Sequence, residues 1–463
     1  MPRLNIHFNI SERKLLLRIF DLLLVLLLLH LVGTGFHFDY FTVSKENWSW
    51  VFVLVLYISV FGTIFEMYDL QKSSKLESVW TTIVLTTSTT VLFYLLTPFF
   101  TPFLPENRLQ IFFFFASILV ALLVWRFAYI KLIVSPRFNR KVLLVGETSN
   151  IKAILDTFKT ADPNYQIIGF INCEKSRGDK VKFLGLTEYS PKEIYQVIKD
   201  ENIFEIVVAS YNSENITPEI YTDLITLLEG GFPIKEYTQV YEDLTKRVPV
   251  QFVGKDFYKY FPFSRSNQNK MYLFFHRFFD VIIAVLGLII GVLLLPLIVI
   301  GNIIANRGVL FYTQERIGKN GRLFRIIKFR TMIKHAEPNG ATWSKKGDSR
   351  ITFFGKFLRN TRLDEIPQFL NILKGDMSLI GPRPERPYFV RELSQVLPFY
   401  ETRHIVKPGL TGWAQVNTRY GSSVDDSLLK LQYDLYYIKH RSFFLDINIL
   451  IKTFSTVIFF RGQ

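Results

Sequence analysis

Four long apolar runs within the first 135 residues constrain this chain more than any other feature of its sequence. A helix needs about 20 apolar residues to cross a bilayer, and each run is at least about that long. We therefore predict that residues 1–135 form a transmembrane four-helix bundle. The runs cover residues 14–36, 48–68, 80–100 and 109–134.

Basic side chains flank these runs unevenly. Loops 37–47 and 101–108 contain few bases. Because basic loops remain on the cytoplasmic side of a bilayer, both ends of the bundle are expected in the cytoplasm. The flanking bases are Arg3, Arg13, Lys14 and Arg18 before the first run, Lys72 and Lys75 between the second and third, and Arg137, Arg140 and Lys141 after the fourth.

The composition restricts the partners that the chain can have. Of the 463 residues, 49% are hydrophobic, and the net charge is +15. This combination favours an anionic membrane surface or phosphate-bearing substrates over nucleic acid. We therefore expect a lipid bilayer as a partner and no nucleic acid. The single cysteine, Cys173, excludes an internal disulfide and a cysteine zinc site.

A small α/β domain is predicted after the bundle. The stretch KVLLVGETSNIKAILDTFK has an apolar strand, a glycine turn and a helix, and QIIGFIN and IFEIVVAS follow as further strands. Strands that alternate with helices indicate a parallel sheet, so we predict a cytoplasmic Rossmann-like domain over residues 136–265. The turn from Gly146 to Asn150 has one glycine, whereas the dinucleotide fingerprint has three. NAD binding is therefore the less supported interpretation of this domain.

A fifth apolar stretch, Phe278–Ile304, lies near the start of the last domain, which we place at residues 266–463. As a helix it would be about 40 Å long, enough to cross a bilayer, but basic residues lie on both sides of it. Pro296 interrupts helical hydrogen bonding past its midpoint. A re-entrant helix over about residues 276–305, bent at Pro296 with both ends in the cytoplasm, explains both facts. A kinked fifth transmembrane helix is the alternative, because charge in a long following domain constrains topology weakly.

Two apolar runs open on the same pattern of charge. RIFD, from Arg18 to Asp21, and RFFD, from Arg277 to Asp280, each have an arginine and an aspartate three residues apart. This spacing places both side chains on one helix face at the membrane interface. Two unrelated interfacial anchors explain the pattern at least as well as a shared role does.

The motif KFR places two bases on one side of a predicted strand. Lys328 and Arg330 alternate with Phe329, so both face the same way. Ammonium and guanidinium groups suit a diphosphate. When KFR is taken alone, a solvated strand face is the better explanation of the motif.

Two adjacent acids, Asp364 and Glu365, lie just before Pro367, a residue at home in the first turn of a helix. That helix is predicted to run through Leu373 and stop at Gly375, which places the acids at its N-terminus, where the dipole favours carboxylates and phosphate. Adjacent helical residues point about 100° apart. This geometry therefore favours two separate roles, one acid as a nucleophile and the other as a metal ligand, over a pair of acids that share one proton. Helix capping by two acids is the alternative.

The motif GPRP holds Arg383 between Pro382 and Pro384. The prolines restrict the backbone around this arginine. A preset arginine can bind an anion at low entropic cost. A rigid turn without a binding role is the alternative.

Taken together, these motifs resemble the polyprenyl-phosphate sugar-1-phosphate transferases, the bacterial sugar transferases that begin lipid-linked assembly of exopolysaccharide, capsule or O-antigen. The resemblance covers residues 270–463 and rests on long motifs in the same order, namely HRFFD, QERIGKNG, KFRTM, LDEIPQFLNILKGDMSLIGPRP and KPGLTGWAQVN. The four-helix bundle and the Rossmann-like domain resemble accessory domains of the large monotopic members of this family.

The resemblance implies a reaction. The donor would be a UDP-sugar and the acceptor undecaprenyl phosphate. Asp364 matches the family nucleophile, which attacks the β-phosphorus, expels UMP and holds a covalent phosphosugar. Glu365 matches the acid that binds Mg²⁺. Four basic residues match positions that bind phosphate or fall in a motif near the active site: Arg359, Arg383, Lys328 and Arg330.

The resemblance also implies a fold and a location. The fold class is membrane α plus α/β, with a four-helix transmembrane bundle, a Rossmann-like domain, and an α/β monotopic phosphoglycosyl transferase domain whose re-entrant helix contains Arg277, Asp280 and Pro296. The catalytic domain would face the cytoplasm at the bacterial inner membrane, because one substrate is soluble and the other is a lipid. A homodimer formed through the accessory domains is plausible.

Two other functions are weighed against this one. A membrane-anchored NAD-dependent sugar-nucleotide dehydratase or epimerase needs a full glycine fingerprint and a Tyr-x-x-x-Lys pair, and Tyr165 and Tyr241 lack the lysine at that spacing. A non-enzymatic membrane scaffold or transporter would not need an Asp-Glu-metal centre.

Overall fold

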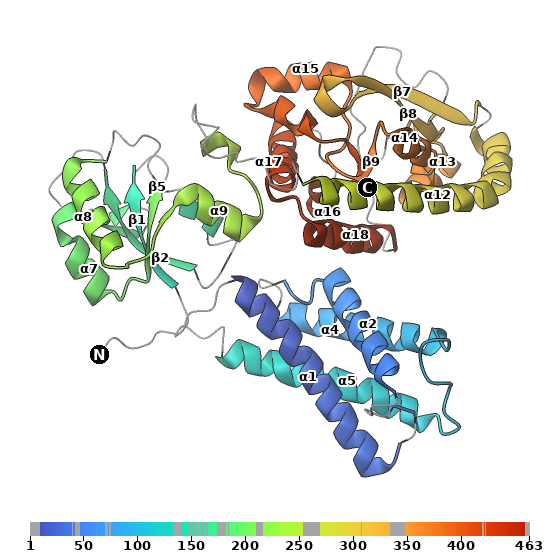
Figure 1. Ribbon diagram of the computed structural model, residues 1–463, viewed down its shortest axis with the longest axis horizontal. Coiled ribbons are helices and arrows are strands. Elements are labelled where there is room, and N and C mark those ends of the chain that lie inside the picture. The colour runs from blue at the N-terminus through green and yellow to red at the C-terminus, as the bar shows by residue number, and fades with distance from the viewer. Residues whose placement is uncertain are drawn as a thin grey trace. The chain divides into compact units, whose positions relative to one another are not determined.

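Two structural units make up the computed structural model, one of residues 1–245 and one of residues 246–463. The helices and strands of both are labelled in Figure 1. The residues that the structure describes are 10–38, 40–41, 47–69, 73, 76–132, 140–147, 151, 154–155, 157–158, 162, 165–173, 182–183, 185–209, 216–252, 269–306, 308–333, 348–418, 421 and 423–458.

The first unit begins with the four predicted apolar helices. Helix α5 packs against α1 and α4, and α4 packs against α2. Three of the four are long and apolar enough to cross a bilayer, whereas α2 has 17 residues and ends before the predicted position 68. The chain turns directly after it, with Glu66 at φ 59°. The helices are α1 (Ile10–Phe36), α2 (Trp48–Ile64), α4 (Leu76–Leu96) and α5 (Leu109–Leu132).

A buried ion pair lies inside this bundle. Arg126 of α5 donates to Asp21 of α1 over 2.8 Å, and the side chains are 1% and 0% exposed. Arg126 also donates to the carbonyl of Met67, while the Arg18 guanidinium lies over the ring of Tyr68. Buried charges inside an apolar bundle require such partners. The two charged residues of the RIFD pattern thus contact different residues, Asp21 the side chain of Arg126 and Arg18 the ring of Tyr68.

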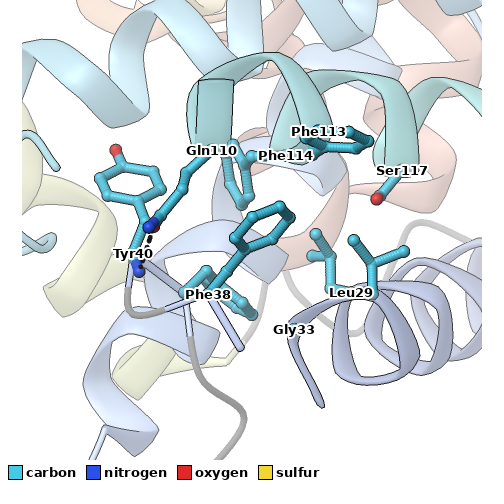
Figure 2. A pocket seen from close by; sticks show the side chains of 10 residues that line it. Leu29, Gly33, Phe38, Tyr40, Gln110, Phe113, Phe114 and Ser117 are labelled. Carbon is cyan, nitrogen blue, oxygen red and sulfur yellow. Dashed lines mark hydrogen bonds between the residues drawn. The ribbon is translucent and has the colours of Figure 1, made fainter. Parts of the chain in front are cut away.

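At one end of the bundle, the chain after α1 packs back onto α5 (Figure 2). The backbone N–H of Tyr40 donates to Gln110 Oε1 over 2.9 Å. The rings of Phe38, Phe113 and Phe114 line a small, mostly apolar pocket there. None of the predicted site residues lines this pocket.

The rest of the first unit is an α/β domain with a six-stranded sheet. The strand order is β3-β4-β2-β1-β5-β6, and all neighbours are parallel except β3 and β4. The predicted parallel sheet is therefore confirmed. The described elements are β1 (Arg140–Gly146), β2 (Tyr165–Asn172), β3 (Lys182–Phe183), β4 (Leu186–Tyr189), α7 (Ile194–Asp200), β5 (Glu205–Ala209), α8 (Pro218–Glu229), β6 (Ile234–Glu236) and α9 (Tyr237–Thr245).

The strand order reverses between β1 and β5, which is the kind of position where open parallel sheets bind ligands. A Cβ atom on Gly146 would lie 2.8 Å from the carbonyl oxygen of Ala209, so the glycine lets β1 and β5 approach closely here. Residues 148–150 of the glycine turn lie outside the described residues. The interpretation of that turn stays a prediction.

In the second unit, two small sheets and several shorter helices pack against one side of a long helix, α12 (Lys270–Gly301). Strands β7 and β8 form an antiparallel hairpin, and β9 and β10 pair in parallel. Its other elements are β7 (Phe311–Ile317), β8 (Leu323–Phe329), α13 (Phe353–Asn360), η7 (Leu363–Glu365), α14 (Gln368–Lys374), β9 (Ser378–Ile380), α15 (Pro387–Val396), η8 (Tyr400–Ile405), β10 (Gly409–Thr411), α16 (Trp413–Asn417), α17 (Val424–His440) and α18 (Phe443–Ile458).

Helix α12 contains the predicted bend residue. Pro296 lies inside the helix, and a π-helical turn, Asn302–Asn306, follows directly. Figure 1 shows that the last turns of α12 run in a different direction from the rest of the helix. The segment Lys270–Asn306 is long and apolar enough to cross a bilayer, and only 17% of its most apolar window is buried.

The second unit begins before the predicted domain boundary at residue 266. Val248 and Val250 are 0% and 1% exposed and pack in a core with residues of α15 and α17. The backbone N–H of Val248 donates to the carbonyl of Gln432 over 3.0 Å. The predicted boundaries at 135/136 and 265/266 themselves lie outside the described residues.

Candidate active site

The two adjacent acids occupy a buried turn between two helices. Asp364 and Glu365 lie in η7, and each is 7% exposed. Arg362, just before η7, has φ 58°, a left-handed conformation that turns the chain sharply. Helix α14 follows and stops at Gly375, as predicted, with φ 90°. Because α14 has only seven residues, nearby cations rather than a helix dipole must compensate the two carboxylates.

Three cations surround Glu365. Lys328 Nζ donates to Glu365 Oε1 over 2.9 Å and Arg383 Nη2 over 3.3 Å, while Arg362 Nη1 donates to Oε2 over 3.4 Å. Burial would raise the pKa of Glu365, but Lys328, Arg383 and Arg362 hold that pKa well below its usual range. Glu365 is therefore ionised at neutral pH.

Asp364 has a different environment. Among the residues that the structure describes, none donates a hydrogen bond to its carboxylate. Burial and the charge of Glu365 raise the pKa of Asp364 to about 6, against the opposing charges of Lys328, Arg359 and Arg362. A buried carboxylate without a donor keeps its lone pairs available, which suits a nucleophile.

The other two predicted phosphate-binding residues make different contacts. Arg359 of α13 donates from Nε to Thr331 Oγ1 over 2.9 Å, and its charge acts on Asp364. Arg330 donates from Nε to the carbonyl of Val309 over 3.0 Å. Because β8 ends at Phe329, the predicted strand alternation places Lys328, and not Arg330, against the acid pair.

Asn371 docks the helix that follows the acids onto strand β8. Its Oδ1 accepts from the backbone N–H of Ile327 over 3.1 Å, and its Nδ2 donates to the carbonyl of Arg325 over 2.8 Å. Lys328 is the next residue of β8 after Ile327. This docking explains why Lys328 reaches Glu365 across 37 positions of sequence.

Helix α12 holds the other end of α14. Arg277 donates to the carbonyls of Ile372 over 2.6 Å and Leu373 over 2.9 Å, so it caps the C-terminal turn of α14. Asp280 accepts from the backbone N–H of Leu379, over 2.8 Å, and from the Ser378 hydroxyl, over 3.1 Å, in β9. The RFFD pattern therefore anchors α14 and β9 to α12, whereas the side chains of RIFD contact other residues of the bundle.

Two glycines of α12 let the acid-bearing segment lie directly on this helix. A Cβ atom on Gly287 would lie 2.3 Å from the ring of Phe369, and one on Gly291 would lie 2.6 Å from Ile366. Contacts this short do not occur between real atoms, so larger residues would push the segment away. The acid pair is thus positioned by close packing on α12.

Four successive carbonyls of the turn that carries Arg383 accept hydrogen bonds. The carbonyl of Pro382 accepts from the N–H of Gly409 and that of Glu385 from the N–H of Ile317. The carbonyls of the two residues between Pro382 and Glu385 accept from arginine side chains. Arg403 Nη2 donates to the carbonyl of Arg383, and Arg316 Nη1 donates to the carbonyl of Pro384, both over 3.1 Å.

Arg403 is itself held by a buried ion pair with Asp434 at 2.7 Å, with side chains 5% and 2% exposed. We expect Arg403→Met to lower the free energy of unfolding by about 3–5 kcal/mol, because it leaves Asp434 charged and unpaired inside the protein. Thermal unfolding in detergent measures this. Arg403→Met with Asp434→Leu should recover much of the loss, and an unchanged melting temperature in the single variant would contradict the role of the pair.

The site contains few residues that could hold a metal ion. Among the described residues, no group of three or more His, Cys, Asp or Glu side chains comes together. Mg²⁺ is bound in many phosphate-handling sites by one or two carboxylates together with substrate phosphates and water. The adjacent carboxylates of Asp364 and Glu365 fit that pattern, and Glu365 would be the ionised ligand.

Sequence reasoning missed several members of this site. Arg362 was not among the predicted site residues, and its left-handed backbone conformation is not visible in the sequence. Arg316, Arg403 and Asp434 make contacts with distant parts of the chain, and Gln368 is a buried residue close to Lys328 and Arg383. Arg316 lies in the motif QERIGKNG and Gln368 in LDEIPQ, so membership of these motifs was the sequence feature that could have indicated a role for either residue.

A Tyr-x-x-x-Lys pair does occur in the chain, at Tyr195 and Lys199 of α7. Sequence reasoning missed it. Tyr195 is 46% exposed and Lys199 is exposed as well. An exposed pair on a surface helix does not provide the enclosed pocket in which a nicotinamide cofactor reacts.

Comparison with known proteins identifies the second unit. The family described as bacterial sugar transferase matches residues 271–460. A UDP-N-acetylgalactosamine-undecaprenyl-phosphate N-acetylgalactosaminephosphotransferase of Aeromonas hydrophila is 38% identical over 256 residues, which are 55% of this chain and 59% of that relative. A UDP-glucose:undecaprenyl-phosphate glucose-1-phosphate transferase of Xanthomonas campestris is 42% identical over 178 residues, 38% of this chain and 37% of that relative.

A shorter relative is covered over most of its length. An uncharacterized sugar transferase of Bacillus subtilis is 40% identical over 156 residues, which are 33% of this chain and 71% of that protein. The two longer relatives are matched over only 59% and 37% of their own lengths. All three matches, together with the site described above, lead to one assignment. The chain belongs to the bacterial sugar transferase family, the polyprenyl-phosphate sugar-1-phosphate transferases.

Proposed function

We propose that this protein transfers a sugar-1-phosphate from a UDP-sugar to undecaprenyl phosphate, and so begins the assembly of a lipid-linked polysaccharide. One observation carries the proposal. Glu365 is neutralised by three cations, while Asp364, its neighbour, receives no hydrogen bond from the described residues. The names of the Aeromonas and Xanthomonas relatives support undecaprenyl phosphate as the acceptor.

The reaction has two displacements at one phosphorus atom. A carboxylate oxygen of Asp364 attacks the sugar-bearing phosphorus, and the bond from this phosphorus to the bridging oxygen breaks. UMP leaves with that oxygen and its electron pair. A phosphate oxygen of the lipid then attacks the same phosphorus, and the bond to Asp364 breaks, which restores the carboxylate and forms a lipid diphosphate sugar.

The cations of the site have a role in both steps. Lys328, Arg383 and Arg362 are already ordered around the acid pair, so they can stabilise charge on phosphoryl oxygens without rearranging during the reaction. Glu365 would hold Mg²⁺, which supplies further charge neutralisation on a diphosphate.

Release of UMP from a panel of UDP-sugars tests the proposal. The purified protein is incubated in detergent with undecaprenyl phosphate and Mg²⁺, with UDP-glucose and UDP-N-acetylgalactosamine first in the panel. We expect sustained UMP release with at least one donor, dependent on the lipid acceptor and abolished by a chelator. Release by none of the donors would contradict the proposed reaction.

The rate should depend on the ionisation of Asp364. Because the pKa of Asp364 is raised to about 6 and only the carboxylate can attack, kcat/KM should rise about tenfold per pH unit below pH 6 and level off above it. Glu365 stays ionised throughout this range. Initial rates between pH 4.5 and 8 measure the profile, and a rate independent of pH between 5 and 7 would exclude Asp364 as the titrating nucleophile.

We also propose that α12 is re-entrant and that the catalytic unit faces the cytoplasm at the bacterial inner membrane. Basic residues on both sides of α12 and Pro296 within it support this. Cysteines placed at Met271 and Val309, which are 68% and 67% exposed, in a Cys173→Ser background, should both be labelled only from the cytoplasmic side. Labelling from opposite sides would make α12 a spanning helix.

A further inference from the structure

A small pocket lies beside the acid pair in the catalytic unit. Its volume is about 220 Å³, counting space that is open to solvent. Lys328 and Arg383, which both contact Glu365, form part of its wall. The remaining lining residues are Arg316, Ile326, Gln368, Pro384 and Gly409.

Gln368, the first residue of α14, contributes an unsatisfied donor to this pocket. Gln368 is 2% exposed, and its Nε2 has no hydrogen-bond partner among the described residues. The Nε of Arg316 likewise lacks an acceptor in the described part of the chain. A buried N–H group without an acceptor is costly and rare, so an acceptor from outside the chain is expected here.

The chemistry of the lining selects the ligand. Arg316, Lys328 and Arg383 can only donate hydrogen bonds, and the carbonyl of Pro384 already accepts from Arg316. Gln368 Nε2 adds a fourth donor group. A pocket with positive charge and unsatisfied donors suits an anion that only accepts hydrogen bonds, and a phosphoryl group is such an anion.

We propose that Gln368 Nε2 donates a hydrogen bond to a phosphoryl oxygen bound in this pocket, with Arg316, Lys328 and Arg383 supplying the opposing charge. The inference rests on the proposed function, in which both the diphosphate of the donor and the phosphate of the lipid acceptor carry such oxygens.

Gln368→Met tests this contact, because methionine keeps the length of the side chain and removes the donor. Binding of inorganic pyrophosphate and of inorganic phosphate is measured by calorimetry with EDTA present, so that only the chain's own groups contribute. Of these two anions, the one that binds wild type more tightly should bind Gln368→Met roughly ten- to a hundredfold more weakly. Gln368→Glu, which adds a repelling carboxylate, should lose more.

The stability of the ligand-free variant separates binding from a structural role. Removal of an unsatisfied buried donor should leave the melting temperature of Gln368→Met equal to or above that of wild type. Gln432→Met is the matched control, because Gln432 is also buried but its Nε2 donates to Gln251 Oε1 over 2.7 Å. That variant should melt earlier and bind pyrophosphate as wild type does.

Kinetics then identify the source of the phosphoryl group. A rise in KM for the UDP-sugar alone assigns the pocket to the donor, and a rise in KM for undecaprenyl phosphate alone assigns it to the acceptor. Unchanged affinity for both anions in Gln368→Met, or no binding of either anion to wild type, would overturn the inference. If binding depends on Gln368 while no donor releases UMP, the proposed transferase reaction fails and the anion pocket remains.

Discussion

Asp364→Asn is expected to reduce turnover with UDP-sugar and undecaprenyl phosphate by roughly 10⁴- to 10⁶-fold, the scale on which loss of a nucleophile affects other enzymes with covalent intermediates. An amide nitrogen or oxygen at this position cannot attack phosphorus as the carboxylate does. The exchange preserves the size of a side chain that is 7% exposed and that receives no hydrogen bond from the described residues. The fold should therefore be retained.

The control for this variant is Asp425→Asn, which removes an exposed carboxylate from the first turn of α17. It should turn over as wild type does. Melting temperatures of both variants show whether the fold is intact. Turnover by Asp364→Asn within tenfold of wild type would mean that another group attacks the donor.

Glu365→Gln is expected to lower kcat/KM by about 10³-fold, the range in which one preorganised charged group contributes to a transition state. Glutamine keeps the volume but removes the charge that holds Lys328, Arg362 and Arg383 together. These cations are 18%, 27% and 30% exposed in their side chains, so they can turn toward water instead of remaining buried unpaired. The loss should therefore appear in activity much more than in stability.

The matched control is Glu315→Gln, which breaks an exposed pair between Glu315 and Arg325 in the same unit. Surface pairs contribute little, so this variant should match wild type in both activity and stability. If Glu365→Gln retained kcat/KM within threefold of wild type, Glu365 would be neither a metal ligand nor an organiser of the cations. Dependence of the remaining activity on Mg²⁺ concentration should also weaken in Glu365→Gln.

Much of the architecture could be predicted from the sequence because it depends on local patterns. The apolar runs predicted the helices of the bundle, and alternating strands and helices predicted the parallel sheet. Pro367 and Gly375 predicted where the helix after the acids begins and ends, and α14 runs from Gln368 to Lys374 between them. Proline and glycine act through the backbone of neighbouring residues, so their effect is visible at short range.

The assembly of the site could be predicted only in part. Lys328 and Arg383 were candidates because of their motifs, but their contact with Glu365 depends on Asn371, which docks α14 onto β8. Arg330 was predicted to share the face of Lys328, and it contacts Val309 instead because the strand ends first. Contacts of this kind join residues far apart in sequence, and no periodicity records them.

The contacts that hold the turn around Arg383 could not be predicted from the sequence either. Two prolines indicated a rigid turn, but not that Arg403 and Arg316 hold its carbonyls. Nor did the sequence show that α12 contacts the acid-bearing segment through Gly287 and Gly291. Because α12 is apolar along most of its length, its sequence pattern does not distinguish Gly287 and Gly291 from small residues that would face lipid.

Detection of the covalent intermediate tests the central claim most directly. Wild-type protein is incubated with Mg²⁺ and a UDP-sugar that supports UMP release, without undecaprenyl phosphate, and its intact mass is measured before and after proteolysis. We predict a mass increase of one phosphosugar, located on the peptide that contains Asp364, absent from Asp364→Asn, and lost when undecaprenyl phosphate is added. Rapid product formation with no adduct on the wild-type protein, or an adduct on a different residue, would contradict the account.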